Sequence, residues 1–263
     1  MSSIYGQWSN LLDMADSDLE AVRRYSGRSV SEAITVAKSL KAEIYFVSAG
    51  LGLVHATDQI PDYDLTTAVN GTLRSLVEDV WDPNRWWDLI SKQNTRHSLA
   101  KVLGQGGGIC LISLPSAYLE LISGDLQRIP SNQAAQVRIF TSRPGVQYVP
   151  DALLQCVMPY DSRLDGPDSP IPGTLADFPQ RAMSHFIHHT AWKPNRTLCD
   201  DRRAVSDSLK NMSTRLVRVD RKKLSDKDIG TALVENWAQI CAMKTPPLKY
   251  FRHELSIACE QSR

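Results

Sequence analysis

Asp62, Tyr63 and Asp64 place two carboxylates around one aromatic ring, shortly after a glycine-containing turn at residues 48–52. A carboxylate can accept the paired N–H groups of a purine edge or remove a proton from water, and the ring offers a stacking face. This group predicts a ligand site with Asp64 and Asp62 as candidate catalytic residues. The candidate ligand-binding residues of the same segment are Ser48, Gly50, Gly52, Tyr63 and Thr66.

The turn at 48–52 follows an apolar, β-rich run at 43–47, which predicts a buried strand. Ligands of open α/β sheets bind beyond the carboxyl ends of the strands, where this turn is expected to lie. Glycines there let backbone amides approach a base or phosphate closely, because no Cβ intervenes. The alternative is a plain turn. The glycine run at 104–108 precedes its strand, so we interpret it as a connector and not as a phosphate loop.

Tyr160 and Asp161 repeat the combination of proline, tyrosine and aspartate in a loop at 159–179. Long loops without secondary structure are usually functional segments or linkers. If this loop and the first motif lie at one edge of the sheet, the two acidic-aromatic groups face each other across a ligand. Solvated loop carboxylates are the competing interpretation.

The segment 178–189 carries Arg181, His185, His188 and His189 at helical spacing. His185 and His189 are four residues apart, as in helical zinc sites, but no glutamate adjoins the first histidine. We therefore expect no metal and no cofactor. The preferred interpretation is a helix that lines the ligand site, with Arg181 or His185 reaching a phosphate or the substrate.

The charge of the chain is unevenly distributed. Residues 181–263 contain 16 Lys and Arg against 9 Asp and Glu, whereas residues 1–180 contain 14 against 20. A basic region of this kind indicates a polyanionic partner, DNA or RNA, although charge runs are often only solvated faces. The candidate nucleic-acid-binding residues are Arg215, Arg218, Arg221, Lys222, Lys223, Lys249 and Arg252.

Helical and strand patterns alternate along the first part of the chain. Helices are expected at 29–40, 67–80, 84–103, 116–122 and 150–157, and strands at 43–47, 109–114 and 137–141. This order predicts an α/β fold with a mostly parallel sheet and flanking helices, over residues 1–180. Ser116 is the expected N-cap of its helix.

Beyond a boundary near 180–200 the pattern changes. Helices are expected at 203–212, 227–243 and 248–259, with a strand at 215–220 and Ser225 as a cap before Asp228. Residues 200–263 are therefore expected to form a smaller basic module of helix-turn-helix or winged-helix type.

The 263 residues contain no apolar run of about 18 residues, which predicts no membrane span, and the N-terminus shows no secretory signal. We expect a cytoplasmic protein without membrane association. The five cysteines include no C-x-x-C pair, which argues against a disulfide framework or a zinc ribbon.

Residues 48–53 (SAGLGL) and 60–66 (IPDYDLT), with 25–29 (YSGRS) before them, resemble the signature of the peroxide-stress protein YaaA-like superfamily. The resemblance covers about residues 20–145. The chain departs from the pattern at its start, where Met1–Asn10 supply no strand ending in cysteine and lysine, and at the additional Asp62. The resemblance implies an α/β body and a DNA-associated role, in a setting that includes 7-deazaguanine modification and bacterial defence.

Two main functional hypotheses follow. The first is a DNA-associated protein that handles a modified base. The family setting implies hydrolysis of the nitrile of 7-cyano-7-deazaguanine to the amide, with an aspartate as general base. The second is a non-catalytic nucleic-acid- or partner-binding component of an anti-phage defence complex, in which the acidic body docks a protein from the same gene cluster. A free-nucleotide or nucleoside hydrolase is a weaker third possibility, because it gives the basic region no use.

Overall fold

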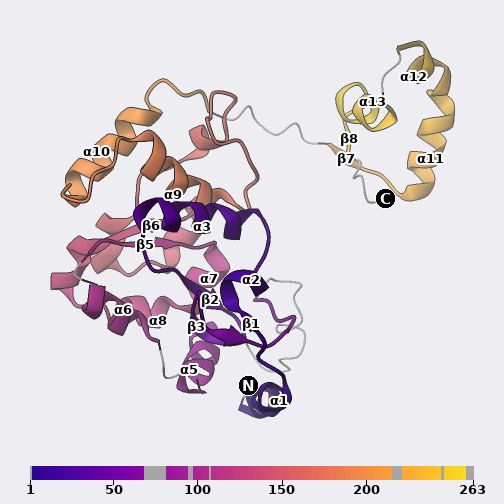
Figure 1. The fold of residues 1–263 in the computed structure, drawn as a ribbon. Helices are drawn as coiled ribbons and strands as arrows, with labels where there is room; N and C mark the ends of the chain where they lie inside the picture. Colours follow the sequence, from indigo (N-terminus) through magenta and orange to yellow (C-terminus); the bar gives the residue numbers. More distant parts are fainter. Residues whose placement is uncertain are drawn as a thin grey trace. The chain divides into compact units, whose positions relative to one another are not determined.

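The computed structural model describes residues 2–67, 81–93, 97–106, 108–214, 221–243 and 246–258. The chain divides into two compact units, Met1–Arg215 and Leu216–Arg263 (Figure 1). The division falls later in the chain than the predicted boundary at 180–200. Helices α9 (Phe178–His189) and α10 (Leu198–Leu209) explain this, because Phe186, Val205 and Leu209 are buried in a core cluster of the first unit.

The strands of the first unit that lie in the described ranges form two-stranded sheets. β1 (Leu19–Glu20) pairs with β4 (Gln59–Ile60), and β2 (Tyr45–Ser48) with β3 (Gly52–His55), both antiparallel. β5 (Cys110–Ser113) and β6 (Val137–Phe140) are parallel, and Ile139 makes a further parallel bridge to Val157. The predicted strands at 109–114 and 137–141 are thus present and parallel. The strand expected at 43–47 is also present, at 45–48, but it continues into a hairpin.

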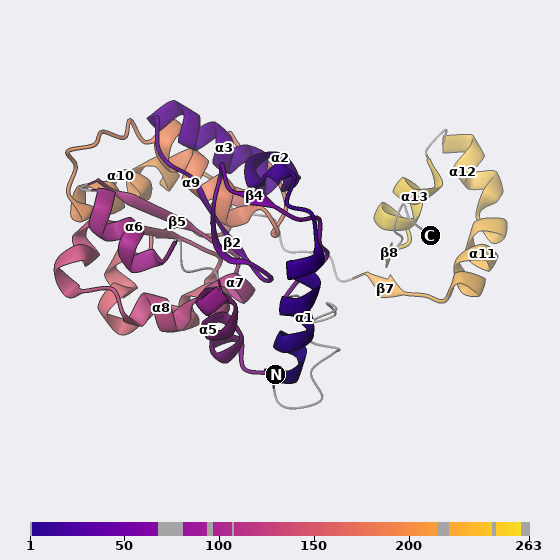
Figure 2. The ribbon, with the colours of Figure 1, turned by 60° about the horizontal axis from the view of Figure 1, so that its bottom comes forward.

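Helices cover both faces of these strands, so the first unit has three layers (Figures 1 and 2). α3 (Arg28–Leu40) and α9 lie on one face; α5 (Pro83–Gln93), α6 (Leu99–Gly106), α7 (Ser116–Leu121) and α8 (Ser123–Gln127) lie on the other. Alternate residues of β6 enter opposite cores: Val137 and Ile139 pack on one side and Phe140 on the other. The remaining elements are α1 (Ser2–Met14), α2 (Ala21–Arg24), and the 3-10 helices η1 (Ser131–Gln136), η2 (Arg143–Tyr148), η3 (Asp151–Cys156) and η4 (Ser162–Asp165).

Several predicted helices differ from the observed ones in extent. The expected helix at 84–103 is two helices, α5 and α6, and the one at 150–157 is the 3-10 helix η3. Ser116 is the first helical residue of α7, and its predecessor Pro115 occupies the N-cap. Most of the helix predicted at 67–80 lies outside the described residues.

The C-terminal unit contains β7 (Lys222–Lys223), α11 (Asp226–Glu235), α12 (Trp237–Met243), α13 (Pro247–His253) and β8 (Ile257–Ala258). Ser225 caps α11 by accepting the backbone N–H of Asp228, as predicted. The helix expected at 227–243 is interrupted at Asn236, and the one expected at 248–259 ends earlier, before β8. The strand predicted at 215–220 lies outside the described residues.

Candidate ligand site

The turn at 48–52 is the loop of the β2–β3 hairpin, and its own serine organises it. The Oγ atom of Ser48 accepts the backbone N–H groups of Gly50 (3.1 Å) and Leu51 (2.9 Å). Gly52 has a φ of +77°, a left-handed conformation that favours glycine. The turn amides that the sequence offers to a base or phosphate are therefore engaged within the turn.

Two tryptophans cover the carbonyl groups of the same turn. The indole N–H of Trp8 donates to the carbonyl of Gly50 (2.8 Å), and that of Trp86 donates to the carbonyl of Ala49 (2.7 Å). A Cβ at Gly50 would lie 2.7 Å from the ring of Trp8, so a glycine is needed for packing at this position. The predicted ligand turn is thus a packed structural element.

Tyr63 is part of the same assembly. Its hydroxyl lies 2.5 Å from Ser48 Oγ and 2.6 Å from the hydroxyl of Tyr25. Since Ser48 Oγ already accepts two amides, its own hydrogen is donated to Tyr63. Burial raises the pKa of Tyr63. Its ring meets the ring of Trp8 edge-on at 5.8 Å, so the predicted stacking face is used inside the protein.

Asp62 and Asp64 point in a different direction from Tyr63. Both aspartates are exposed, and the Asp62 side chain retains 88% of its accessible surface. Asp62 lies 3.8 Å from Arg24, an exposed and therefore weak ion pair. The described structure thus gives neither of the predicted catalytic carboxylates an enclosed position. Thr66 is partly buried and hydrogen-bonds Tyr118 of α7, which places this segment near the carboxyl end of β5.

Tyr160, which is partly buried, and His185, which is buried, are brought together. The Tyr160 hydroxyl lies 3.0 Å from His185 Nδ1, and the His185 ring stacks on the ring of His189 at 5.2 Å. Burial, with His189 nearby, lowers the pKa of His185 to about 4. His185 is therefore neutral at pH 7 and cannot attract a phosphate by charge. No three histidine, cysteine or acidic side chains of the described residues converge as metal ligands.

Arg181 has a structural position that differs from the prediction. It is fully buried, and its Nε and Nη2 atoms bind Asp177 (2.8 Å) and Asp165 (2.5 Å). Its other hydrogen bonds go to the backbone carbonyls of Leu164, Ile171 and Thr174. All five guanidinium hydrogens are thereby used, so none is left for a phosphate. The long loop is held from inside by this arginine.

Asp161 stabilises the conformation of the same loop. Its carboxylate accepts the backbone N–H of Arg163 as the N-cap of η4 and pairs with the Arg163 guanidinium at 2.8 Å. The hydrogen bond from the Arg163 side chain lowers the pKa of Asp161. Tyr160 and Tyr63 contact different groups of side chains, and among the described residues no hydrogen bond or ring contact joins the two tyrosines.

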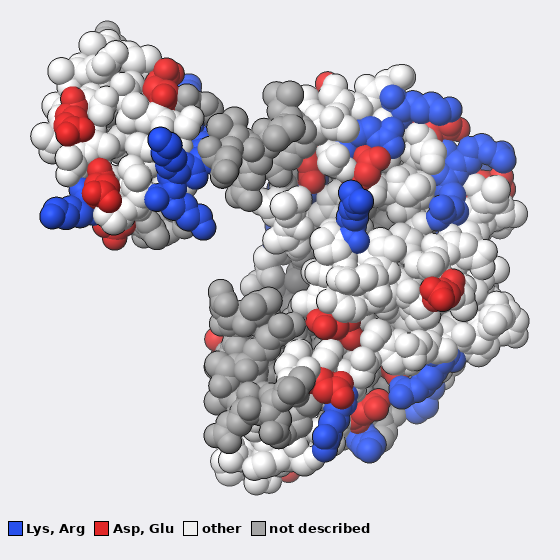
Figure 3. Space-filling model, turned by 180° about the vertical axis from the view of Figure 1, so that it is seen from behind, with Lys and Arg blue, Asp and Glu red and all other residues white. Residues whose placement is uncertain are grey.

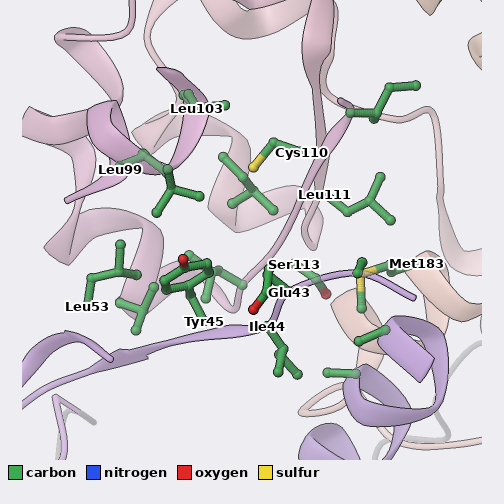
Figure 4. A pocket seen from close by; sticks show the side chains of 18 of the residues that line it. Glu43, Ile44, Tyr45, Leu53, Leu99, Leu103, Cys110, Leu111, Ser113 and Met183 are labelled. Carbon is green, nitrogen blue, oxygen red and sulfur yellow. The ribbon is translucent and has the colours of Figure 1, made fainter. Parts of the chain in front are cut away.

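A cavity of about 640 Å³ lies elsewhere, between β2 and β5 (Figure 4). One side is walled by the apolar side chains of Leu53, Leu99 and Leu103, and Met183 of α9 lies at the opposite side. Tyr45, Cys110 and Ser113 also line it. Burial raises the pKa of Cys110 to about 11, so this cysteine is a neutral thiol and not a nucleophile at pH 7.

The two strands present main-chain groups to this cavity. In the hairpin, the backbone N–H of Ala56 donates to the carbonyl of Ile44. Because the main-chain groups of successive residues in a strand point to opposite edges, those of Tyr45 and Val47 point away from β3. In the parallel pair, the backbone N–H of Leu114 donates to the carbonyl of Phe140. By the same alternation, the main-chain groups of Leu111 and Ser113 point away from β6. The cavity therefore combines apolar walls with hydrogen-bonding strand edges.

A group of titratable side chains that the sequence reasoning missed adjoins Tyr45. His55 Nε2 lies 2.5 Å from Glu43, and His97 Nε2 lies 3.0 Å from Asp58. The Tyr45 ring contacts both imidazoles edge-on, at 4.9 and 5.4 Å. The pairing of Tyr45 with His55 across β2 and β3 follows from the hairpin. No sequence motif connects His97 to them.

Some of the predicted nucleic-acid-binding cations of the C-terminal unit lie close together. Arg221 donates from Nε to the backbone carbonyl of Arg252 (3.0 Å), which joins the start of β7 to the end of α13. Lys222, Lys223 and Lys249 are exposed. A group of adjoining Lys and Arg side chains is visible on one part of this unit in Figure 3, whereas its acidic side chains are dispersed. The predicted Arg215 and Arg218 lie outside the described residues.

Comparisons of the chain with protein-family models, with curated proteins and with solved structures each find no match. The resemblance to the YaaA-like superfamily therefore stays a prediction. None of the helices in the described ranges has both the length and the apolar composition needed to cross a bilayer.

Proposed function

We propose that this chain is a nucleic-acid-associated protein whose first unit binds a nucleobase-like ligand in the cavity between β2 and β5. The observation that carries the proposal is the combination of apolar walls with two strand edges that pair with no further strand among the described residues, around about 640 Å³. Binding pockets for small organic molecules typically measure 300–1,000 Å³ and combine mostly apolar walls with a few polar groups. A planar base fits this chemistry, because its faces are apolar and its edge carries donors and acceptors.

The C-terminal unit supports the nucleic-acid part of the proposal. Arg221 and Arg252 adjoin, and three exposed lysines lie on β7 and α13 of the same small unit. Clustered cations on one element contact phosphates and release counterions, which makes binding sensitive to salt. DNA is the preferred partner, with RNA as the other arm of the test.

Hydrolysis of 7-cyano-7-deazaguanine in DNA is the finer form of the proposal, and its support is the resemblance of residues 25–66 to the YaaA-like signature. The geometry around Asp62 and Asp64 favours binding over chemistry, because both carboxylates are exposed. A general base works within hydrogen-bond reach of an enclosed substrate. A non-catalytic role in a defence complex therefore remains the second form.

The pocket is tested by filling it. Val102 of α6 lines the cavity, whereas Ala100 of the same helix is exposed, so Val102→Trp and Ala100→Trp are a matched pair. Isothermal titration with 7-cyano-7-deazaguanine is expected to show binding to the wild type and to Ala100→Trp. Val102→Trp is expected to weaken binding at least about tenfold, the change that 1.4 kcal/mol produces. Equal affinity of all three proteins, or no binding to any, would contradict the pocket assignment.

The C-terminal cations are tested by charge reversal. Changing Arg221, Lys222 and Lys223 together to glutamate should weaken binding of duplex DNA and flatten its dependence on salt. Fluorescence anisotropy across a salt series measures both, with single-stranded RNA of equal length in parallel. A control with the same charge change uses the exposed cations Arg23, Lys92 and Arg203 of the first unit. If both triple variants bind alike, the C-terminal unit is not the nucleic-acid contact.

A further inference from the structure

Ser113 and Gln180 each carry a buried polar atom without a hydrogen-bond partner among the described residues. The atoms are Ser113 Oγ and Gln180 Oε1. Gln180 lies on α9 and is only 8% exposed. A buried polar atom left unpaired costs stability, and the large majority of buried side-chain polar atoms are paired in folded proteins. Two of them in adjoining residues therefore require an explanation.

The orientation of the Gln180 side-chain amide is fixed by the hydrogen bond of its nitrogen atom. Its Nε2 donates to the backbone carbonyl of Ser113 at 2.9 Å, on the β5 edge that faces away from β6. That bond assigns the nitrogen, so the remaining Oε1 is an acceptor that awaits a donor. The Ser113 hydroxyl beside it can donate and accept. The two neighbouring residues thus offer a donor and an acceptor.

The position of this pair points to a ligand. Ser113 is the last residue of β5, at the carboxyl end of the parallel strands, where α/β folds bind their ligands. It also lines the cavity between β2 and β5, close to Met183 of the same α9 helix (Figure 4). Ser113 therefore lines an otherwise largely apolar cavity, and Gln180 lies next to it through its hydrogen bond to the Ser113 carbonyl.

We propose that Ser113 and Gln180 form the polar end of this cavity and bind a neighbouring N–H and C=O of the ligand, an amide or the lactam edge of a base. The ligand N–H is donated to Gln180 Oε1, and the Ser113 hydroxyl is donated to the ligand carbonyl. This inference rests on the proposed function, and it names the ligand edge that the cavity selects. Both protein groups are uncharged, which suits a neutral ligand edge and not a phosphate.

Ser113→Ala tests the inference because its effects on binding and on stability are expected to differ. Affinity for 7-cyano-7-deazaguanine, which has a lactam edge, should fall at least about tenfold. Affinity for benzimidazole, which has a similar ring shape but no lactam, should not change. The melting temperature of the free protein should stay level or rise by about 2–4 °C, since the substitution removes an unpaired buried hydroxyl.

Ser208→Ala is the matched control. Ser208 is partly buried on α10, and its hydroxyl donates to the carbonyl of Val205 at 2.7 Å. Its replacement should leave both affinities unchanged. Gln180→Leu is a second probe, which should also abolish the preference for the lactam over benzimidazole.

The outcomes separate this inference from the pocket itself. If Val102→Trp blocks binding but Ser113→Ala and Gln180→Leu keep the wild-type preference for the lactam, the polar end is wrong and the pocket stands. If Val102→Trp has no effect, the pocket assignment fails and the inference fails with it. A lower melting temperature for Ser113→Ala with unchanged affinities would show that the hydroxyl has a structural role.

Discussion

Ser48 and Ser113 each end a strand of the first unit, yet their hydroxyls have opposite surroundings. Ser48 Oγ accepts two amides and lies within hydrogen-bond distance of Tyr63, whereas Ser113 Oγ has no partner among the described residues. The YaaA-like signature includes Ser48 but does not include Ser113. A recurring pattern of polar residues can therefore encode a locked turn, while a site lies at a residue that no pattern marks.

The difference has a physical basis. A fully paired buried network stabilises the fold and specifies one conformation, and it has no capacity left for a ligand. An unpaired buried group destabilises the free protein and recovers that cost only when a partner arrives. Buried polar residues whose hydrogen bonds are all made within the protein thus stabilise the fold, whereas those with an unpaired atom are candidates to bind a ligand.

The largest effect is expected at Arg181 of α9, which binds the long loop with all five of its guanidinium hydrogens. Arg181→Met should destabilise the protein by about 3–5 kcal/mol, because it leaves the buried carboxylate of Asp165 without its cation and Asp177 with only the partly exposed Arg28. Denaturant unfolding followed by tryptophan fluorescence measures the change. Arg163→Met is the control from the same loop. Its ion pair with Asp161 is partly exposed, so the expected loss is about 1 kcal/mol or less. Equal losses would show that burial of the pair does not matter here.

Ser48→Ala is expected to have a smaller but clear effect. It leaves the amides of Gly50 and Leu51 without an acceptor and removes one of the two hydroxyl partners of Tyr63, for a loss of about 1–3 kcal/mol. Affinity for the base in the cavity should not change, because Ser48 does not line it. The same two measurements on Ser113→Ala should give the reverse result. If both serine variants behave alike, the contrast between the two strand ends has no functional meaning.

Local patterns predicted much of the fold and little of the site. The apolar runs at 109–114 and 137–141 became β5 and β6, since buried parallel strands need near-continuous apolar sequence. The turn at 48–52 was predicted to follow a strand, but the strand after it, β3, was not predicted, because its sequence GLVH begins with a glycine, a residue depleted in strands. The cavity depends on how β2 and β5 are spaced in three dimensions. That spacing leaves no periodicity in the sequence.

The buried polar residues show the same limit. Arg181 was predicted to bind a phosphate because the arginine side chain suits phosphate recognition. The sequence alone cannot show that the loop at 159–179 folds back and accepts hydrogen bonds from the Arg181 guanidinium. Ser113 lies in the run ICLIS, where one serine among apolar residues carries no motif. Gln180 is close to it only through the packing of α9 against β5.

The smallest effect is expected at Asp64, the residue that the sequence favoured for catalysis. Its side chain is exposed, so Asp64→Asn should change stability by less than about 0.5 kcal/mol and leave affinity for the base unaltered. Asp62→Asn, at the position where the chain departs from the YaaA-like signature, is the matched control. Mass spectrometry of nucleosides from modified DNA treated with each variant measures chemistry directly. A fall of two to four orders of magnitude in Asp64→Asn alone, the usual contribution of a positioned acid or base, would establish a catalytic carboxylate. Such a result would require Asp64 to become enclosed when DNA binds, and it would overturn the preference for binding over hydrolysis while leaving the pocket and its polar end intact.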